Sequence, residues 1–305
     1  MEMTWLEGII LGIVQGLTEF LPVSSSGHLL IGKELLGIEA SENLTFEIVV
    51  HAATVLSTIV IFRKQIWQLL CGFFKFKNND EMDYVLKIGV SMIPIFIVGM
   101  FFKDNVEALF TSLLSVGIAL CVTAVLLALS DYVTKKASAK SAALEVATAE
   151  GSKGETEGVE GSKVVTDGSE GQSVKGGKRN GITYWQALVV GLGQAIAVIP
   201  GLSRSGTTIA TGLICGVKRE VMAQFSFLMV LIPILGEAFL SIVGGDLVGS
   251  SIGIAPLITG FISAFLSGLL ACKAMIALVK RSKLSWFALY CVVVGIIVIV
   301  SSVNG

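Results

Sequence analysis

Long apolar runs separated by short polar segments dominate the sequence. Six of these runs are long enough for a helix to cross a bilayer, which takes about 17–25 residues. They cover residues 44–62, 84–102, 112–130, 220–243, 252–272 and 284–302. The pattern therefore predicts an all-α polytopic membrane protein with six transmembrane helices.

Two further apolar stretches, 4–37 and 183–216, are each interrupted by a polar turn. The first breaks at Pro22-Val-Ser-Ser-Ser-Gly27 and the second at Pro200-Gly-Leu-Ser-Arg-Ser-Gly206. The pieces on either side are short for a complete crossing. Broken backbone at membrane depth is tolerated only where protein or a water-filled cavity surrounds it. We therefore expect two re-entrant helical hairpins.

The two halves of the chain repeat each other when Thr4 is aligned with Thr183, an alignment that we call the repeat register. The other matched pairs include Gln15 and Gln194, Ser24 and Ser203, Ser26 and Ser205, and Gly27 and Gly206. The ladder Gly8, Gly12, Gly16 falls on Ala187, Gly191, Ala195, and such small residues four apart let helices approach closely in lipid. Each half contains one hairpin and three spans, and because three is odd the second half is predicted to be inverted. Inverted repeats bring their broken helices together near the midplane, so we expect the two polar turns to meet.

The segment between the halves differs in composition from the rest. The whole chain is 53% hydrophobic and 15% charged, whereas soluble domains carry about 25% charged residues. Residues 135–181 instead consist mainly of Gly, Ser, Glu, Lys and Thr, without an aromatic side chain. Such a segment buries too little apolar surface to fold. We predict a first repeat over 1–134, a disordered cytoplasmic linker over 135–181 and a second repeat over 182–305.

Most lysines and arginines lie in four loops that alternate with the spans. These loops are 63–87, 131–182, the turn near 218, and 273–283. If both hairpins return to the side they entered, all four loops fall on one face. The positive-inside rule makes that face cytoplasmic and places both termini outside. The five cysteines form no CxxC pair and are interpreted as core residues.

The first polar turn holds several groups suited to chemistry. Gln15 and Glu19 are four apart and share a helix face, and an acid at membrane depth is usually functional, although a helix–helix hydrogen bond is the alternative. The candidate substrate-binding and catalytic groups that follow are Ser24, Ser25, Ser26, Gly27 and His28. Serines here also suit helix N-caps, while a helix N-terminus suits phosphate. His28 can serve as acid, base or nucleophile.

The second polar turn contains an arginine within an apolar hairpin. Its candidate phosphate-binding residues are Ser203, Arg204, Ser205, Gly206 and Thr207. A guanidinium binds phosphate through two parallel hydrogen bonds; a resting ion pair with Glu19 is the alternative. Elsewhere in the spans, we interpret His51 and Glu237 as packing or hydrogen-bond residues and Glu47 as a candidate to line the cavity.

Metal ligands are sparse in both turns. Glu19 is the one acid, and Gln15 offers a neutral oxygen. This set suits a hydrated Mg²⁺ or Ca²⁺ held mainly by substrate phosphates, and not zinc in a closed site. The chain has no G-x-x-x-x-G-K-[ST] loop, so ATP use is not indicated.

At these residues the chain resembles the bacterial undecaprenyl-diphosphate phosphatase family of the bacitracin-resistance type. The resemblance rests on Gln15-Gly-Leu-Thr-Glu-Phe-Leu-Pro-Val-Ser-Ser-Ser-Gly-His28 and Pro200-Gly-Leu-Ser-Arg-Ser-Gly-Thr-Thr208, and it covers nearly all of the chain apart from the linker. It implies hydrolysis of undecaprenyl diphosphate to undecaprenyl phosphate and inorganic phosphate. This reaction recycles the lipid carrier of cell-wall synthesis and confers bacitracin resistance.

The resemblance also implies a divalent cation and a multi-pass location in the bacterial plasma membrane, with the site facing the extracytoplasmic side. Gln15 and Glu19 match the family's acidic motif, Ser25 its proposed nucleophile, His28 its conserved histidine, and Ser203 and Arg204 its phosphate-binding motif. Gln15 stands where many members carry a carboxylate, and the long linker is unusual. The expected partners are a polyprenyl diphosphate lipid and the membrane, with no nucleic acid; a homodimer is left open.

In the expected reaction, Arg204 and the two helix N-termini hold the diphosphate. Either Ser25 or a water molecule attacks the terminal phosphorus, and His28 and Glu19 manage the proton. The alternative is a polyprenyl-lipid flippase or anion transporter, because inverted repeats with broken helices are also typical of carriers.

Overall fold

The computed structural model describes residues 3–38, 44–77, 79–102, 113–151, 179–244, 252–281 and 283–304. Within these ranges the regular structure is entirely helical. The elements are α1 (Trp5–Phe20), α2 (Ser25–Leu36), α3 (Leu44–Phe73), α4 (Asp80–Phe101), α6 (Leu113–Gly151), η3 (Arg179–Gly181), α7 (Tyr184–Ile196), α8 (Arg204–Ile214), α9 (Arg219–Gly244), α10 (Ile254–Arg281) and α11 (Ser285–Asn304). Six of the described helices, α3, α4, α6, α9, α10 and α11, are long and apolar enough to cross a membrane. The predicted all-α fold with six spanning helices is confirmed, and it fits a multi-pass membrane protein.

The helix pairs α1–α2 and α7–α8 form the two hairpins. With 16 residues, α1 is about 24 Å long at 1.5 Å per residue, less than the roughly 30 Å hydrocarbon core. Both hairpins begin with the same capping box, in which Thr4 pairs with Glu7 and Thr183 pairs with Gln186. The two hairpins thus start from local sequence signals that coincide in the repeat register.

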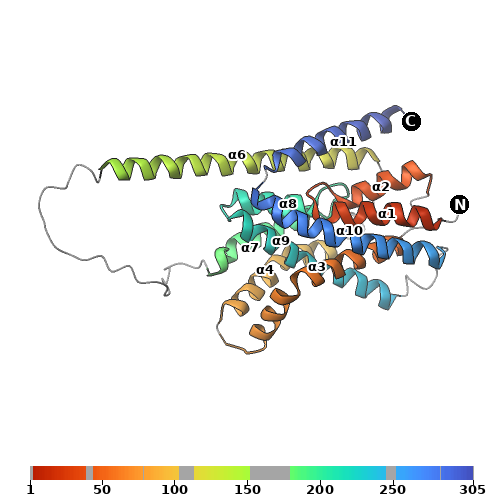
Figure 1. Cartoon of the computed structure of the whole chain (residues 1–305), viewed down its shortest axis with the longest axis horizontal. Coiled ribbons are helices and arrows are strands. Elements are labelled where there is room, and N and C mark those ends of the chain that lie inside the picture. Colours follow the sequence, from red (N-terminus) through yellow and green to blue (C-terminus); the bar gives the residue numbers. More distant parts are fainter. Residues whose placement is uncertain are drawn as a thin grey trace, which may run out of the picture.

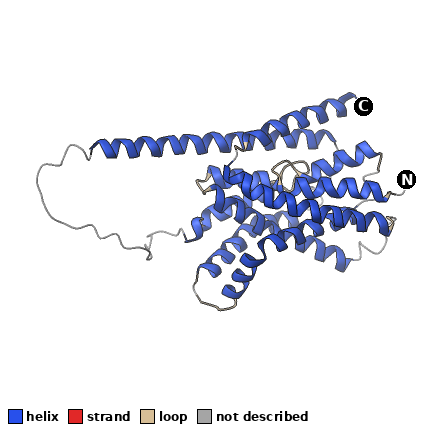
Figure 2. Cartoon of the chain, in the orientation of Figure 1, coloured by secondary structure: helices blue, strands red, loops and turns tan. Residues whose placement is uncertain are grey.

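The two hairpins enter the molecule from opposite ends (Figure 1). Both chain termini lie at one end beside the first hairpin, whereas α7 begins at the other end of the helix bundle (Figure 1). The turns of both hairpins lie near the middle of the molecule's length, among the loops drawn in tan (Figure 2). The described helices therefore have the inverted arrangement that an odd number of spans per half requires.

Each hairpin packs its first helix against a span of the other half, α1 on α10 and α7 on α4. The glycine ladder makes this possible, since a Cβ added at Gly12 would collide with the Ser263 hydroxyl and the Gly260 carbonyl. In the second half, a Cβ at Gly191 would collide with the backbone of Ser91. The close helix contact predicted from the ladders is confirmed at both positions.

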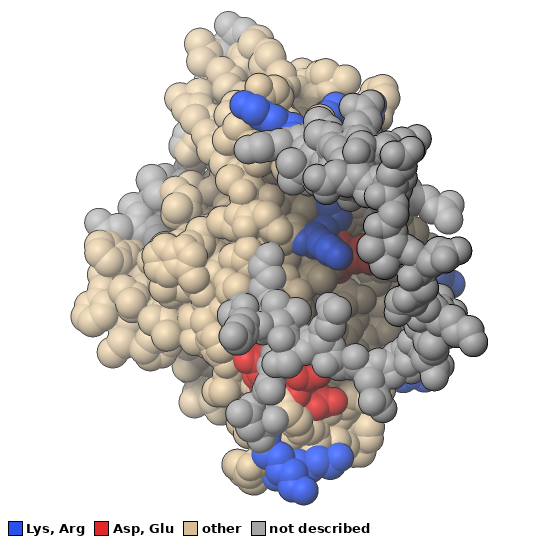
Figure 3. Space-filling model, turned by 90° about the vertical axis from the view of Figure 1, so that its left-hand side faces the viewer, with Lys and Arg blue, Asp and Glu red and all other residues tan. Residues whose placement is uncertain are grey.

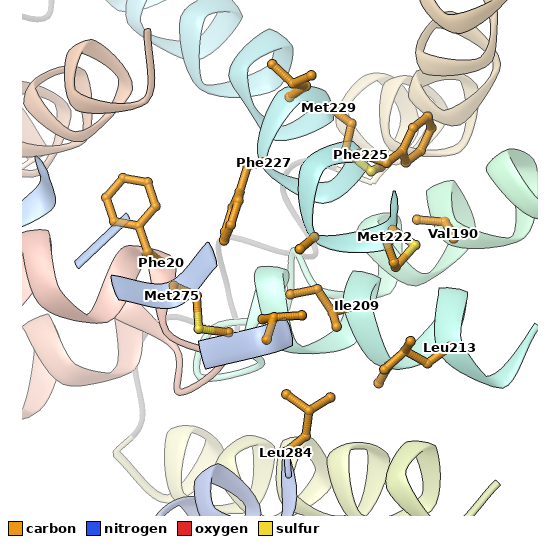
Figure 4. Close-up of a cluster of buried hydrophobic side chains, with 14 of the residues drawn as sticks. Phe20, Val190, Ile209, Leu213, Met222, Phe225, Phe227, Met229, Met275 and Leu284 are labelled. Carbon is orange, nitrogen blue, oxygen red and sulfur yellow. The ribbon is translucent and has the colours of Figure 1, made fainter. Parts of the chain in front are cut away.

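A buried apolar cluster supports the hairpins from the side of α9. Phe20 and Phe227 meet edge to face with ring centroids 5.9 Å apart, and Figure 4 shows the two rings side by side. The neighbouring Phe225, Met222 and Met229 are fully buried. Because Phe20 directly follows Glu19, its anchoring fixes the end of α1 that carries this acid.

One predicted boundary is wrong. The predicted linker begins at residue 135, but α6 continues as a helix to Gly151. Residues 135–150 contain mainly Ala, Lys, Glu, Leu, Ser and Thr with no Gly or Pro, so intrinsic helix propensity accounts for the extension. The remainder of the predicted linker, 152–178, lies outside the described residues.

Candidate active site

The two polar turns are in direct contact. The Ser205 hydroxyl of the second turn donates a hydrogen bond of 3.1 Å to the Leu21 carbonyl, just before the first. A Cβ added at Gly27 would lie 3.3 Å from Gly201 Cα, and one added at Gly206 would lie 3.2 Å from Pro22 Cβ. In the repeat register, Gly27 corresponds to Gly206 and Pro22 corresponds to Gly201, so the two contacts are equivalent. The turns therefore meet about a local pseudo-twofold axis.

Ser24 and Ser203 have the same structural role in the two turns. Each is the N-cap of the following helix and accepts the amide hydrogen of the glycine three residues later, at 3.3 Å for Gly27 and 3.1 Å for Gly206. Each cap hydroxyl also lies 3.5 Å from the hydroxyl two residues on, that of Ser26 or Ser205. Ser24 adopts a φ of 71°, a conformation that is uncommon outside glycine and that concentrates at functional sites. Both caps are almost fully buried, so they fix the helix N-termini from which the other side chains project.

Glu19 gathers the polar groups of the first hairpin. Its Oε2 atom accepts hydrogen bonds from the Ser25 hydroxyl at 2.7 Å and from Gln15 Nε2 at 2.8 Å. The Nε2 atom of His51, on α3, lies 3.7 Å from the same oxygen. The hydroxyl of Ser25 is thus already directed at a carboxylate that can accept its proton.

Arg204 faces Ser25 and Glu19 across a shared hollow, which we call the polar pocket. It is lined by Thr18, Glu19, Ser24, Ser25, Ser26, His51, Ala197, Leu202, Ser203, Arg204 and Ser205. Within the described part of the chain, the Arg204 guanidinium makes no hydrogen bond or ion pair, so the alternative of a resting pair with Glu19 is not observed. A cation without an anionic partner, beside two helix N-termini, is an arrangement that binds an anion.

A second hollow, the apolar pocket, adjoins the polar pocket between α3 and α9. It shares Glu19, Arg204 and Ser205 with the polar pocket. Its apolar walls are formed by Phe20, Val55, Phe227, Val230, Leu231 and Ile234. The two pockets together place an anion-binding group beside an apolar wall.

His28 does not line either of these pockets. Its Nδ1 atom is 2.8 Å from the Ser24 carbonyl, and its Nε2 atom is 2.8 Å from the Tyr290 hydroxyl. The two rings stack with centroids 5.6 Å apart. Both ring nitrogens of His28 are therefore occupied, and the contact with Tyr290 joins α2 to α11.

His51, rather than the predicted His28, lies beside Glu19. From the sequence, His51 is interpreted as a packing or hydrogen-bond residue. The available signal was its spacing of four from Glu47, which puts an acid and a histidine on one face of an apolar helix. Glu47 itself forms an ion pair with Lys33, and it lines, with His51 and Glu237, a further pocket between α3 and α9.

The remaining sequence candidates serve mainly to pack or orient their neighbours. Gly27 and Gly206 provide the close approach between the turns, and their amides bind the cap serines. Thr207 is buried with no partner for its hydroxyl among the described residues, and it lines neither pocket. Gln15 is fully buried and uses its amide group to donate to Glu19.

The site can offer a metal ion only a few protein ligands. No group of three or more His, Cys, Asp or Glu side chains in the described ranges is arranged to hold a metal. The described hydrogen bonds to Glu19 all reach Oε2, which leaves Oε1 open. The Gln15 side-chain oxygen is buried without a partner among the described residues and lies outside the pockets. The donors fit a cation that is completed by ligands from the substrate, with Glu19 rather than Gln15 as the protein's contribution.

Away from the site, a polar hollow opens at the end opposite the termini, where acidic side chains gather (Figure 3). It is lined in part by Gln65, Gln68, Asp80, Glu81 and Tyr84. This hollow contains none of the residues that meet at the two turns, so we do not assign it to the candidate site.

Comparison with known proteins gives one consistent result. A family model described as bacitracin resistance protein BacA matches residues 8–297. A protein of Bacteroides fragilis named undecaprenyl-diphosphatase is 49% identical over 304 residues, covering 98% of this chain and 99% of the relative. Proteins with the same name from Bacteroides thetaiotaomicron and Methanococcus vannielii are 48% and 34% identical, over 98% and 96% of this chain and 99% of each relative.

Proposed function

The chain belongs to the bacitracin resistance protein BacA family, and from this premise we propose that it hydrolyses undecaprenyl diphosphate to undecaprenyl phosphate and inorganic phosphate. The observation that carries the proposal is the guanidinium of Arg204, unpartnered among the described residues, which shares a pocket with the hydrogen-bonded pair of Ser25 and Glu19. An anion-binding group thus lies beside a hydroxyl that can be deprotonated. The prenyl chain stays in the lipid between the spans in this proposal, so only the headgroup enters the polar pocket.

Arg204 holds the diphosphate through parallel hydrogen bonds from its planar guanidinium. The N-termini of α2 and α8 add a favourable dipole for negative charge. The hydroxyls of Ser26 and Ser205 line the same pocket and are available to phosphate oxygens. These groups also stabilise the charge that shifts during phosphoryl transfer.

Ser25 is the nucleophile in the route that the geometry favours. Its Oγ attacks the terminal phosphorus while Glu19, 2.7 Å away, accepts the hydroxyl proton. The bond from that phosphorus to the bridging oxygen breaks, and undecaprenyl phosphate leaves with the electron pair and takes the proton from Glu19. Water then attacks the phosphoserine with Glu19 as base, which releases inorganic phosphate and restores Ser25. In the alternative route, water attacks directly and Ser25 orients it.

A divalent cation held by Glu19 and the phosphates of the substrate would neutralise part of the negative charge of the diphosphate. In this scheme Gln15 orients Glu19 by donating to its Oε2. His28 holds α2 against α11 through Tyr290. This positioning role differs from the proton transfer expected from the sequence.

The site is proposed to work from the extracytoplasmic side. Lysine and arginine are concentrated in the segments that follow α3, α6 and α10 and in the C-terminal parts of these helices, which the positive-inside rule assigns to the cytoplasm. Both termini lie at the opposite end, beside the first hairpin (Figure 1). A substrate headgroup in the outer leaflet would therefore reach the polar pocket from the end that carries the termini.

Phosphate release from undecaprenyl diphosphate by the purified protein in detergent tests this function directly. Detergent removes the two compartments that a carrier needs, so a flippase or anion transporter would release no phosphate. We expect multiple turnovers in the presence of a divalent cation and their loss with a chelator. Lipid movement in vesicles without phosphate release in detergent would refute the proposal.

A further inference from the structure

We propose that the polar hollow at the end opposite the termini binds a small organic cation with two primary ammonium groups, such as an aliphatic diamine. The hollow is lined by residues of α3, α4 and α9 and by Asn180 of η3, and we call it the α3–α4–α9 hollow. It shares no lining residue with the polar pocket between the two turns, so this proposal is independent of the proposed hydrolysis.

The size of the α3–α4–α9 hollow suits a small organic molecule. Its volume is about 230 Å³, which corresponds to about seven liquid waters at 30 Å³ each. By the same measure the polar pocket between the turns has a volume of about 40 Å³. Figure 3 looks onto the end of the molecule at which this hollow lies and shows acidic side chains gathered there. A small molecule can therefore enter without a movement of the helices.

Tyr84 supplies the observation that points to a ligand. This residue of α4 lines the hollow and is 7% exposed. Its ring packs edge to face against Phe225 of α9 with centroids 5.7 Å apart, which fixes the direction of the side chain. The hydroxyl nevertheless has no hydrogen-bond partner among the described residues. Buried hydroxyls are nearly always hydrogen-bonded, because the bonds that they lose to water must be replaced. A ligand in the hollow would supply the missing partner.

The charges around the hollow select a cation. Asp80 and Glu81, in the first turn of α4, both line it, and no lysine, arginine or histidine is among its described lining residues. The Glu81 carboxylate makes no hydrogen bond or ion pair with any described residue. A Cβ added at Gly72 would collide with Glu81 Cβ, so the stem of this acid is held against α3. A carboxylate that is fixed in place without a cationic partner favours an ammonium group.

The rest of the lining suits the other parts of a diamine. Gln65, Gln68 and Gln224 bring carboxamide oxygens, and none of the three side chains is hydrogen-bonded to a described residue. Carboxamide oxygens accept hydrogen bonds from an ammonium group. Leu69 and Val221 provide apolar surface for the methylene groups between the two ammonium ends. An anion would instead meet two carboxylates, and a neutral molecule would leave both of them without a countercharge.

A ligand in this hollow would also join the two halves of the chain. The helices α3 and α4 belong to the first repeat, whereas α9 and Asn180 belong to the second. The Asn180 side chain already donates a hydrogen bond of 2.7 Å to the Asp80 carbonyl, just before the second hairpin begins. A ligand that binds only the folded protein raises the thermal unfolding midpoint. We therefore expect a diamine to stabilise the protein against heat.

The test uses the full-length protein in detergent at constant ionic strength. Binding of 1,4-diaminobutane is measured by isothermal titration calorimetry, and the thermal unfolding midpoint is followed in parallel. We expect saturable binding and a raised midpoint with the diamine, and neither with 1,4-butanediol, which has the same length but no charge. The affinity for the diamine should fall about 10-fold or more in Glu81→Gln and about 2- to 10-fold in Tyr84→Phe. The matched control Glu34→Gln, at an exposed acid of α2 outside the hollow, should bind the diamine as the wild type does.

The inference is overturned if the wild type does not bind the diamine, if the diol binds equally well, or if either Glu81→Gln or Tyr84→Phe keeps the wild-type affinity. Tyr84→Phe retains the ring and its packing against Phe225, so it decides the matter alone if Glu81→Gln does not fold. Phosphate release from undecaprenyl diphosphate, measured without the diamine, tests the proposed hydrolysis separately. Each of the two proposals can therefore fail while the other stands.

Discussion

The two polar turns share a scaffold but differ at the positions that carry the chemistry. Cap serines, second serines and glycines are identical in the repeat register, and they make equivalent hydrogen bonds in both turns. In contrast, Ser25 of the first turn corresponds to Arg204 of the second, and Glu19 corresponds to Val198. In the proposed reaction, one turn therefore supplies the nucleophile with its base, and the other supplies the anion-binding cation.

This division explains why the site needs both halves. A nucleophile and a guanidinium at equivalent positions in inverted hairpins face each other when the turns meet about the pseudo-twofold axis. Identical residues at these positions would place two hydroxyls or two like charges together, and like charges in one pocket repel. The repeat supplies the geometry, and divergence at single positions supplies the reaction.

Removing the nucleophile of the first turn should lower the activity more than any other change considered for the two turns. We expect Ser25→Ala to lower kcat by at least about 10⁴-fold, because loss of an attacking group removes the covalent route altogether. Ser138→Ala, at an exposed serine on the projecting part of α6, is the matched control and should retain wild-type turnover. Steady-state phosphate release measures both variants. Retention of more than a tenth of the activity in Ser25→Ala would favour the route with direct attack by water.

Replacing the arginine of the second turn by the serine of the first should lower the activity nearly as much. In Arg204→Ser the guanidinium is lost, and we expect kcat/KM to fall about 10²- to 10³-fold, as on removal of a key charge-stabilising donor. Arg204→Lys keeps the charge but loses the bidentate geometry, so its activity should lie between those of Arg204→Ser and the wild type.

Arg63→Ala is a suitable control for the loss of an arginine. This exposed residue on α3 donates to the Val60 carbonyl, within its own helix, so its removal should leave kcat/KM unchanged. Equal activity of Arg204→Ser and the wild type would show that phosphate is bound elsewhere.

Replacing the cap serine of either turn should lower the stability of the protein by a small and similar amount. We expect Ser24→Ala and Ser203→Ala each to destabilise the protein by about 1 kcal/mol, the usual cost of losing an N-cap hydroxyl. The measurement is the shift of the thermal unfolding midpoint in one detergent. Ser24→Gly and Ser203→Gly provide the comparison, since glycine is tolerated at N-caps at a cost of a few tenths of a kcal/mol. A large rise in KM without destabilisation would instead identify these serines as substrate ligands.

The spans, hairpins and meeting of the turns could be predicted from the sequence because they depend on local or repeated features. Apolar run length determines a span, and a polar break shortens a helix. The internal repeat then places Ser25 opposite Arg204 without knowledge of any contact. The end of α6 was predicted wrongly because the composition argument considered burial alone and omitted helix propensity.

The orientation of the two histidines could not be predicted in the same way. His28 lies close to Ser25 in the sequence, yet its ring is bound to Tyr290 on the last helix. His51 reaches Glu19 only because α3 packs beside α1. Both contacts depend on tertiary packing between helices, which neither spacing nor local pattern encodes.

The smallest expected effect concerns His28 and distinguishes a positioning role from proton transfer. In Tyr290→Phe the ring stacking is kept and one hydrogen bond is lost, so we expect a destabilisation of about 0.5–1.5 kcal/mol and less than a tenfold change in kcat. If His28 acts only by holding α2 against α11, His28→Asn should produce a comparable loss of stability and a similarly small change in kcat, with an unaltered dependence of kcat on pH. A fall in kcat of about 10²-fold or more in His28→Asn alone would restore the proton-transfer role predicted from the sequence. The pair of variants thus separates what the ring does through Tyr290 from what it does to the substrate.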